Sequence, residues 1–149
     1  MKMHTPIGQL LKKKGGEIST IAQDVTVYDA VKTMDEKRMG SLLILDDQGH
    51  LAGIFTERDC LRKVVLAGLQ PESVQVGQVM TTKVIYVTPE TTVDECMTLV
   101  TEKRFRHLPV IDSNEKILGV ISSGDLVKFV ASEKAFLIEN LEKYIQGSL

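Results

Sequence analysis

An internal repeat constrains the fold of this chain more than any other feature. A shift of 66 residues aligns Thr26–Val65, the first repeat, with Thr92–Ala131, the second repeat, without a gap. Upstream, Ile7–Leu11 resembles Val76–Met80 at an offset of 69 residues. The identical pairs are Thr26/Thr92, Val27/Val93, Glu36/Glu102, Lys37/Lys103, Arg38/Arg104, Leu42/Leu108, Asp46/Asp112, Gly53/Gly119, Asp59/Asp125 and Val64/Val130. Each repeat alone is too short to bury much apolar surface, so we expect the two to pack on each other.

Both repeats predict the same order of elements. A Thr with an acidic residue three positions later starts a helical apolar pattern at Thr26 and at Thr92. A short apolar run, a polar turn, a second apolar run and a helix near Asp59 or Asp125 then follow. We therefore expect an α/β (α+β) fold of two tandem β-α-β-β-α units, related by pseudo-twofold symmetry with two clefts between them. The expected boundaries are 1–70 for unit 1, 71–131 for unit 2 and 132–149 for a C-terminal helix.

Composition narrows the function. The chain has 149 residues, a net charge of −2 and 43% hydrophobic residues, which is ordinary for a globular protein and argues against a nucleic-acid partner. Its apolar runs are far shorter than the roughly 20 residues of a membrane span. We expect a cytoplasmic protein with no membrane association. No metal-ligand spacing and no nucleophile–base arrangement occurs in the sequence, so we expect no metal site and no catalytic residues.

Three motifs identify a family resemblance. They are Gly53–Asp59 (GIFTERD), Gly119–Asp125 (GVISSGD) and Arg106–Asp112 (RHLPVID). Together they resemble a pair of CBS domains, the cystathionine β-synthase or Bateman module, over nearly the whole chain. With no catalytic domain fused to it, the sequence is similar to small stand-alone CBS-pair proteins.

The resemblance implies a function. It predicts a non-catalytic regulatory module that binds an adenosine ligand in the clefts, such as AMP, ADP, ATP, NAD(H) or S-adenosylmethionine. Such a module senses energy or redox state for a regulated protein, whose identity the sequence does not reveal. The resemblance also implies a homodimer that forms through exposed helices.

Ser122 and Asp125 have two compatible interpretations. A Ser or Thr followed three residues later by an acid forms a capping box at a helix start. The resemblance instead implies that the Asp125 carboxylate accepts hydrogen bonds from both ribose hydroxyls, with Ser122 near the ribose or phosphate. A helix N-terminus is also an anion site, so both interpretations can hold together. Thr56 and Asp59 have the same two interpretations in the first repeat.

Charge distinguishes the two clefts. Arg106 and His107 belong to a basic cluster in an otherwise acidic chain. On its own, Arg106 fits a solvated charge at a helix end, and His107 fits a polar residue beside a strand. The resemblance implies that both face the phosphates beside Ser122 and Asp125. The first repeat has Gly40 and Ser41 at these positions, which cannot neutralise a phosphate. We therefore expect the Asp125 cleft to be occupied first, whereas the Asp59 cleft has only Arg58 as a helper.

The segment from Lys14 to Ile21 is expected to line the main cleft. The resemblance implies an adenine slot near Ser19 and Ile21, closed by Met39. Lys14 is a candidate phosphate ligand, although a run of lysines equally fits a solvated loop. The residues predicted at the main cleft are Lys14, Ser19, Ile21, Met39, Arg106, His107, Pro109, Ser122 and Asp125; those predicted at the second, weaker cleft are Gly40, Ser41, Thr56, Arg58 and Asp59.

The C-terminal tail and the cysteines leave alternatives open. Residues 132–149 have a helical pattern beyond the repeat, which fits packing on the module itself as well as a dimer or partner helix. Cys60 and Cys96 lie on predicted apolar helix faces and fit small buried residues. The main alternative function is a protein–protein regulatory or dimerisation module in which nucleotide is bound only structurally. An enzyme acting on nucleotides is disfavoured, because no base, nucleophile or metal set accompanies the clefts.

Overall fold

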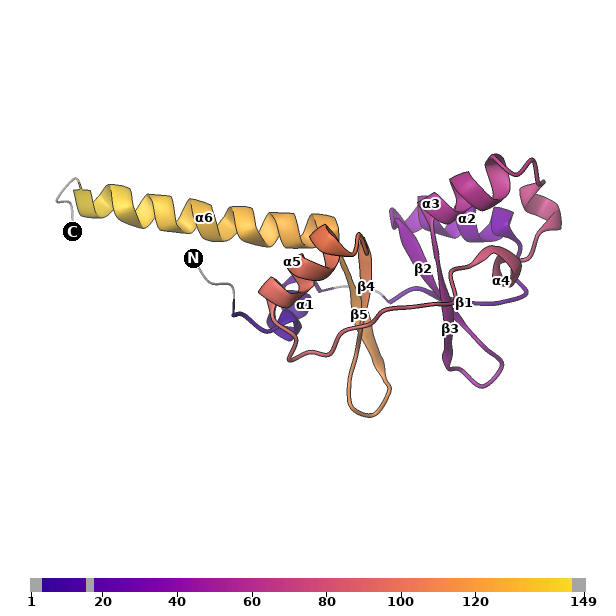
Figure 1. Cartoon of the computed structure of the whole chain (residues 1–149), viewed down its shortest axis with the longest axis horizontal. Coiled ribbons are helices and arrows are strands. Elements are labelled where there is room, and N and C mark those ends of the chain that lie inside the picture. The colour runs from indigo at the N-terminus through magenta and orange to yellow at the C-terminus, as the bar shows by residue number, and fades with distance from the viewer. Residues whose placement is uncertain (1–3, 16–17, 146–149) are drawn as a thin grey trace. The chain divides into compact units, whose positions relative to one another are not determined.

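The structure, a computed structural model, describes residues 4–15 and 18–145 and divides into two compact units (Figure 1). The first unit, Ser19–Val84, is named the Asp59 unit. The second unit combines Met1–Ile18 with Ile85–Leu149 and is named the Asp125 unit. The N-terminal segment thus belongs to the unit that contains the second repeat. The boundaries at residues 70 and 131 stay predictions about the repeats and differ from this division in space.

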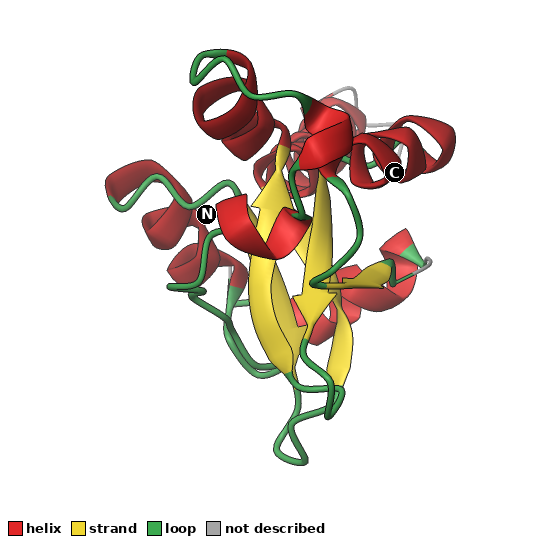
Figure 2. Cartoon of the chain, turned by 90° about the vertical axis from the view of Figure 1, so that its right-hand side faces the viewer, coloured by secondary structure: helices red, strands yellow, loops and turns green. Residues whose placement is uncertain are grey.

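The Asp59 unit is a small sheet with helices packed on it. Figure 2 draws the strands in yellow and the helices in red. The strand order is β1-β2-β3, with β1 parallel and β3 antiparallel to β2. Its elements are β1 (Thr20–Ala22), α2 (Val27–Lys37), β2 (Ser41–Leu45), β3 (Leu51–Thr56), α3 (Glu57–Cys60), a π-helical turn (Leu61–Val65), a 3₁₀ turn (Pro71–Ser73) and α4 (Val76–Val79).

The Asp125 unit repeats this arrangement with two differences. Its elements are α1 (Ile7–Lys14), α5 (Val93–Glu102), β4 (His107–Ile111), β5 (Ile117–Ser122) and α6 (Ser123–Ile145). The strand expected before α5 is reduced to a single parallel bridge between Val87 and Val110. Proline explains this difference: in the Asp59 unit the Leu43 N–H donates to the Ser19 carbonyl, but the equivalent Pro109 has no N–H. The second difference is the length of α6.

The helix starts predicted from the sequence are confirmed. The Thr26 hydroxyl accepts a hydrogen bond from the Asp29 N–H at 3.1 Å, and the Thr92 hydroxyl accepts one from the Glu95 N–H at 3.2 Å. These contacts satisfy backbone donors that an α-helix leaves free in its first turn. Equivalent threonines therefore start equivalent helices in the two units.

Equivalent residues also form the two cores. The Asp59 unit buries Val27, Ala30, Met34, Leu42, Ile44, Phe55, Val64, Val74, Val76 and Val79. The Asp125 unit buries Ile7, Leu10, Val87, Val93, Cys96, Leu108, Val110, Ile121 and Leu126. Each core thus contains two residues of an entrance helix: Val76 and Val79 of α4 in one unit, and Ile7 and Leu10 of α1 in the other.

The entrance helices α1 and α4 dock in the same way. The Ile7 N–H donates to the Thr91 carbonyl, and the Val76 N–H donates to the Val25 carbonyl, both at 2.7 Å. A glycine follows each donor, because a Cβ on Gly8 would lie 3.1 Å from the Pro89 Cβ, and one on Gly77 would lie 3.0 Å from the Gln23 carbonyl oxygen. The first repeat is therefore completed by α4, which follows it, and the second repeat by α1, from the other end of the chain.

The helix expected for the C-terminal tail exists and is continuous with the helix that closes the second repeat. Helix α6 runs from Ser123 to Ile145, whereas residues 146–149 of the predicted segment lie outside the described residues. Within the described part of the chain, no helix is both long and apolar enough to cross a membrane.

Candidate functional site

Asp125 lies in the first turn of α6 and joins three parts of its unit. Its Oδ2 accepts hydrogen bonds from the Ser122 N–H and from Lys14 Nζ, both at 2.8 Å. The Ser122 hydroxyl in turn accepts a hydrogen bond from the Asp125 N–H at 3.1 Å. The capping-box interpretation is therefore confirmed in its geometry. Among the described residues, Asp125 Oδ1 accepts no hydrogen bond.

Lys14, the last residue of α1, holds the carboxylate in its charged form. Its Nζ also donates to the Val120 carbonyl at 2.7 Å, so one ammonium group ties α1 to both β5 and α6. Burial alone would raise the pKa of Asp125, but the hydrogen bonds from Lys14 and from Ser122 lower it more, and the pKa lies below its ordinary value. The side chain of Asp125 keeps 18% of its exposure and that of Lys14 keeps 40%, so both can reach solvent.

Strand register places Arg106 and His107 beside this site. His107 pairs with Ser122 in the ladder of β4 and β5, and the Arg106 carbonyl accepts a hydrogen bond from the Ser123 N–H at 2.9 Å. Arg106 is exposed and His107 half-buried. Pro109 is buried two pairs further along the same strand. The structure therefore gathers Lys14, Arg106, His107, Ser122 and Asp125 at one end of a single unit, and their role in binding a nucleotide stays a prediction.

The equivalent site in the Asp59 unit has a more fully bonded carboxylate. Asp59 Oδ2 accepts from the Thr56 N–H at 3.0 Å and from the Thr56 hydroxyl at 3.2 Å. Asp59 Oδ1 accepts from the Thr81 hydroxyl at 2.9 Å and from Lys63 Nζ at 3.1 Å. Both oxygens are thus occupied, and the side chain keeps only 9% of its exposure. Neither Thr81 nor Lys63 was predicted from the sequence, because the motif that singles out Asp59 ends before both residues.

The other residues predicted near Asp59 lie where the repeat puts them. Ser41 pairs with Thr56 in the ladder of β2 and β3, and the Gly40 carbonyl accepts a hydrogen bond from the Glu57 N–H at 3.1 Å. Arg58 is exposed on α3. In this unit, no cationic side chain occupies the positions of Arg106 and His107, as expected.

Three residues predicted for the main cleft belong to the Asp59 unit. Ser19 and Ile21 lie at β1, and Met39 follows α2. Ser19 is buried, and among the described residues its hydroxyl has no hydrogen-bond partner. A buried hydroxyl without a partner is unfavourable and marks a place where a ligand or water would be stabilised. The roles of these three residues as adenine contacts stay predictions.

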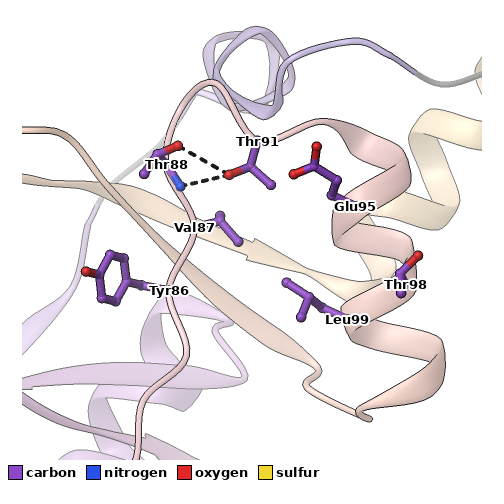
Figure 3. Close-up of a pocket in the computed structure, with 7 residues that line it drawn as sticks. All are labelled: Tyr86, Val87, Thr88, Thr91, Glu95, Thr98 and Leu99. Carbon is purple, nitrogen blue, oxygen red and sulfur yellow. Dashed lines mark hydrogen bonds between the residues drawn. The ribbon is translucent and has the colours of Figure 1, made fainter.

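A hollow of about 420 Å³ in the Asp125 unit was not predicted from the sequence (Figure 3). Its lining residues are Tyr86, Val87, Thr88, Thr91, Glu95, Thr98 and Leu99. Its threonine hydroxyls are engaged internally: Thr88 with Thr91 at 3.3 Å, and Thr98 with the Asp94 carbonyl at 3.2 Å. Its only charged lining residue is the acidic Glu95, so it offers nothing to neutralise a phosphate.

The cysteines are placed as small core residues. Cys96 is buried, and burial, with a smaller contribution from Glu95, raises the pKa of its thiol to about 11. Cys60 is half-buried, and burial raises its pKa as well. A search over the described residues finds no group of three or more metal-ligating side chains.

Comparison with known proteins identifies the module. The family model for the CBS domain matches twice, at residues 7–66 and 76–132. A curated relative is the mitochondrial CBS domain-containing protein CBSX3 of Arabidopsis thaliana, 42% identical over 151 residues, which cover 96% of this chain and 73% of that protein.

Solved structures agree with this match. A putative signal-transduction protein with CBS domains from Burkholderia ambifaria superposes with a TM-score of 0.80 at 48% identity, covering 86% of this chain and 95% of that one. A hexameric CBS-CP12 protein from bloom-forming cyanobacteria superposes with a TM-score of 0.74 at 31% identity, covering 85% and 68% of the two chains. The repeat, the paired capping boxes and these matches agree: the chain belongs to the CBS-domain family and is a tandem CBS pair, a class of regulatory module.

Proposed function

We propose that this protein is a non-catalytic sensor that binds an adenine nucleotide at the site built around Asp125. The observation that carries the proposal is the meeting of Ser122 and Asp125, at the N-terminus of α6, with the ammonium group of Lys14 and the backbone carbonyl of Arg106. A carboxylate with one oxygen that no described residue bonds suits a ribose diol, and a cationic group beside a helix N-terminus suits a phosphate. CBS pairs often bind adenine nucleotides, which supports the same conclusion.

The ion pair between Lys14 and Asp125 has a defined part in this proposal. Without ligand, the ammonium group occupies one oxygen of the carboxylate that would receive the ribose. Lys14 ends its helix and keeps 40% of its side-chain exposure, so its ammonium group borders solvent into which it can turn. On binding, Lys14 moves from Asp125 to the phosphate, and the ribose hydroxyls take its place. Ser19, Ile21 and Met39 contact the adenine in this scheme.

Thermal unfolding with candidate ligands tests the proposal. Nucleotide-free protein is heated with AMP, ATP, NADH or S-adenosylmethionine, because a ligand at 100 times its Kd stabilises the folded state by about 2.7 kcal/mol. We expect a rise in Tm with at least one ligand, and loss of that rise in Asp125→Ala. Asp59→Ala is the matched control and keeps the rise. No shift with any of the four ligands contradicts the proposal, and an unchanged shift in Asp125→Ala contradicts the assignment to this site.

Mass spectrometry identifies the ligand directly. Small molecules released from freshly purified protein by denaturation are compared with those released from Asp125→Ala. An adenosine-containing species that co-purifies only with the unaltered protein supports the proposal and names the ligand. Folded protein, incubated with each nucleotide and then analysed for products, tests the expectation that the protein performs no catalysis.

The length of α6 favours a second function. In this alternative, the protein is a protein–protein regulatory module that binds nucleotide only structurally. This helix continues past the end of the second CBS match at residue 132 to Ile145. Removal of the residues after Ser132 separates the two functions. Loss of partner binding with unchanged nucleotide binding supports the second function.

Assembly and location complete the proposal. We propose a homodimer, since CBS pairs often dimerise and a structural neighbour is hexameric. The location follows from composition and remains the cytoplasm in this proposal, although one relative is mitochondrial. Fractionation of cells that express the tagged protein tests the location.

A further inference from the structure

A stripe of heptad spacing follows α6 along a face that the rest of its unit leaves uncovered. Val127, Ala131, Lys134, Ile138 and Leu141 are separated alternately by four and three residues, the a/d spacing of a coiled coil. We name these five residues the α6 seam. All five are exposed, and the apolar members Val127, Ile138 and Leu141 keep 62%, 56% and 51% of their surface accessible.

The α6 seam is separate from the face by which α6 packs on its own unit. Leu126 is buried in the core, and Phe129 and Val130 pack against it. The seam therefore lies on another side of the helix. It spans about 21 Å, four turns, at the α-helical rise of 1.5 Å per residue, and the C-terminal half of α6 extends past α5 and the strands of its own unit (Figure 1). An apolar stripe of this length in water favours a partner helix.

We propose that the partner is a second molecule of this chain, whose α6 packs antiparallel against the α6 seam. This inference rests on the proposed homodimer and names the surface that forms it. In an antiparallel coiled coil, a positions lie opposite d positions. Ala131 then meets Leu141 of the second molecule, and Lys134 meets Ile138. The contact is isologous, so both molecules contribute the same residues.

Charge selects the antiparallel orientation. Lys128 and Glu142 are exposed and flank the seam at equivalent e positions. Antiparallel packing brings Lys128 of each molecule to Glu142 of the other, which gives two symmetric ion pairs. Parallel packing would instead place Lys134 directly opposite Lys134, with two like charges in one layer. A single Lys in the seam of an antiparallel pair keeps its ammonium at the edge and specifies the register.

Cysteine cross-linking tests the orientation. Ala131→Cys and Leu141→Cys are made separately in a Cys60→Ser background; Cys96 stays unreactive because it is buried and its thiol has a pKa of about 11. The two variants are co-expressed with different tags and treated with a short bismaleimide. We expect a cross-linked heterodimer from the pair and no cross-link from either variant alone. Ser132→Cys, exposed one residue outside the seam, replaces Ala131→Cys in the control and measures random collisions.

The outcomes separate this inference from the proposed homodimer. If sedimentation shows the unaltered protein to be a monomer, both fail. If it is a dimer but Ala131→Cys and Leu141→Cys do not cross-link above the Ser132→Cys control, only the α6 pairing fails. Cross-linking of Ala131→Cys with itself also overturns the pairing, because it requires parallel helices.

A charge swap gives an independent readout on folded protein. We expect Lys128→Glu and Glu142→Lys each to raise the dimer Kd about tenfold, since each replaces two attractive contacts by repulsive ones. The double variant Lys128→Glu/Glu142→Lys restores the Kd to within about twofold. A double variant that dimerises no more tightly than either single one overturns the pairing.

Discussion

Asp59 and Asp125 occupy the same position in the two repeats, but their surroundings differ. In the Asp59 unit, Thr81 bridges to β3: its N–H donates to the Ile54 carbonyl at 2.8 Å, and its hydroxyl donates to Asp59 at 2.9 Å. In the Asp125 unit, Lys14 Nζ alone makes both equivalent contacts, to the Val120 carbonyl and to Asp125. The contacts that the backbone N–H and hydroxyl of Thr81 make in the Asp59 unit are thus made by a single long, charged side chain, Lys14, in the Asp125 unit.

This difference in hydrogen-bond partners indicates which of the two carboxylates can exchange a partner for a ligand. Asp59 is bonded at both oxygens: by its own cap, by a backbone-anchored threonine and by the half-exposed Lys63 of the π-helical turn. Asp125 has one oxygen that no described residue bonds, and one held by a half-exposed lysine. The first arrangement stabilises a fold, whereas the second leaves a ligand room to compete.

Among the predictions, we expect the largest effects on stability from removing the two carboxylates one at a time. The two losses in the free energy of unfolding are expected to differ. Asp59→Ala removes a cap and two further contacts to a buried side chain, so we expect a loss of about 3 kcal/mol in the free energy of unfolding. Asp125→Ala removes a more exposed cap and one ion pair, for a loss of about 1 kcal/mol. Urea unfolding of both variants measures the difference. Equal losses would contradict the contrast between the two sites.

Lys14→Met is expected to distinguish phosphate binding from ribose binding. If Lys14 moves to the phosphate, its loss lowers the affinity for AMP by about 10- to 100-fold, the effect of a charged hydrogen bond. The affinity for adenosine stays unchanged or rises, because Asp125 no longer has a competing partner. Calorimetric titration measures both, with Lys13→Met, the exposed neighbour, as the matched control. Equal losses for AMP and adenosine would show that Lys14 only supports the fold.

The pH dependence gives the smallest expected effect. The pKa of Asp125 is lowered in the folded state, so its ion pair adds stability above the unfolded pKa of about 3.9, and that stability is lost as the pH falls through the lower folded value. In Lys14→Met the pKa of Asp125 rises, because the largest attractive partner is gone. NMR titration of the carboxyl carbon measures this rise. An unchanged pKa would mean that the lysine does not hold the carboxylate in solution.

The helix caps could be predicted from the sequence because the residues that form each cap are close together in the chain. The Thr26 and Thr92 caps and the paired Ser122 and Asp125 each lie within four residues, and the repeat itself cross-checks them. The expected first strand of the second repeat was only partly right, since Pro109 lacks the donor that Leu43 supplies.

Long-range choices could not be predicted in the same way. Because Ile7–Leu11 and Val76–Met80 are alike, either segment fits either repeat, and nothing in the pattern decides which one docks where. The resemblance assigned Lys14 and Asp125 to the same cleft, but the ion pair between them follows from that docking and was not predicted. A run of lysines gave only the choice between a solvated loop and a phosphate ligand, and the structure shows a third arrangement, an ion pair.

The docking of α1 on the second repeat also sets an order of events during synthesis. Residues 7–14 leave the ribosome before the Asp59 unit, but their packing partners in α5 and β5 are made after that unit. The Asp59 unit, a continuous stretch ending at Val84, can close while translation continues. Helix α1 must then wait, with Ile7 and Leu10 unburied, until α5 and β5 have emerged. The site around Asp125 is therefore completed only after α1 has waited for the whole Asp59 unit and for β5 to be made.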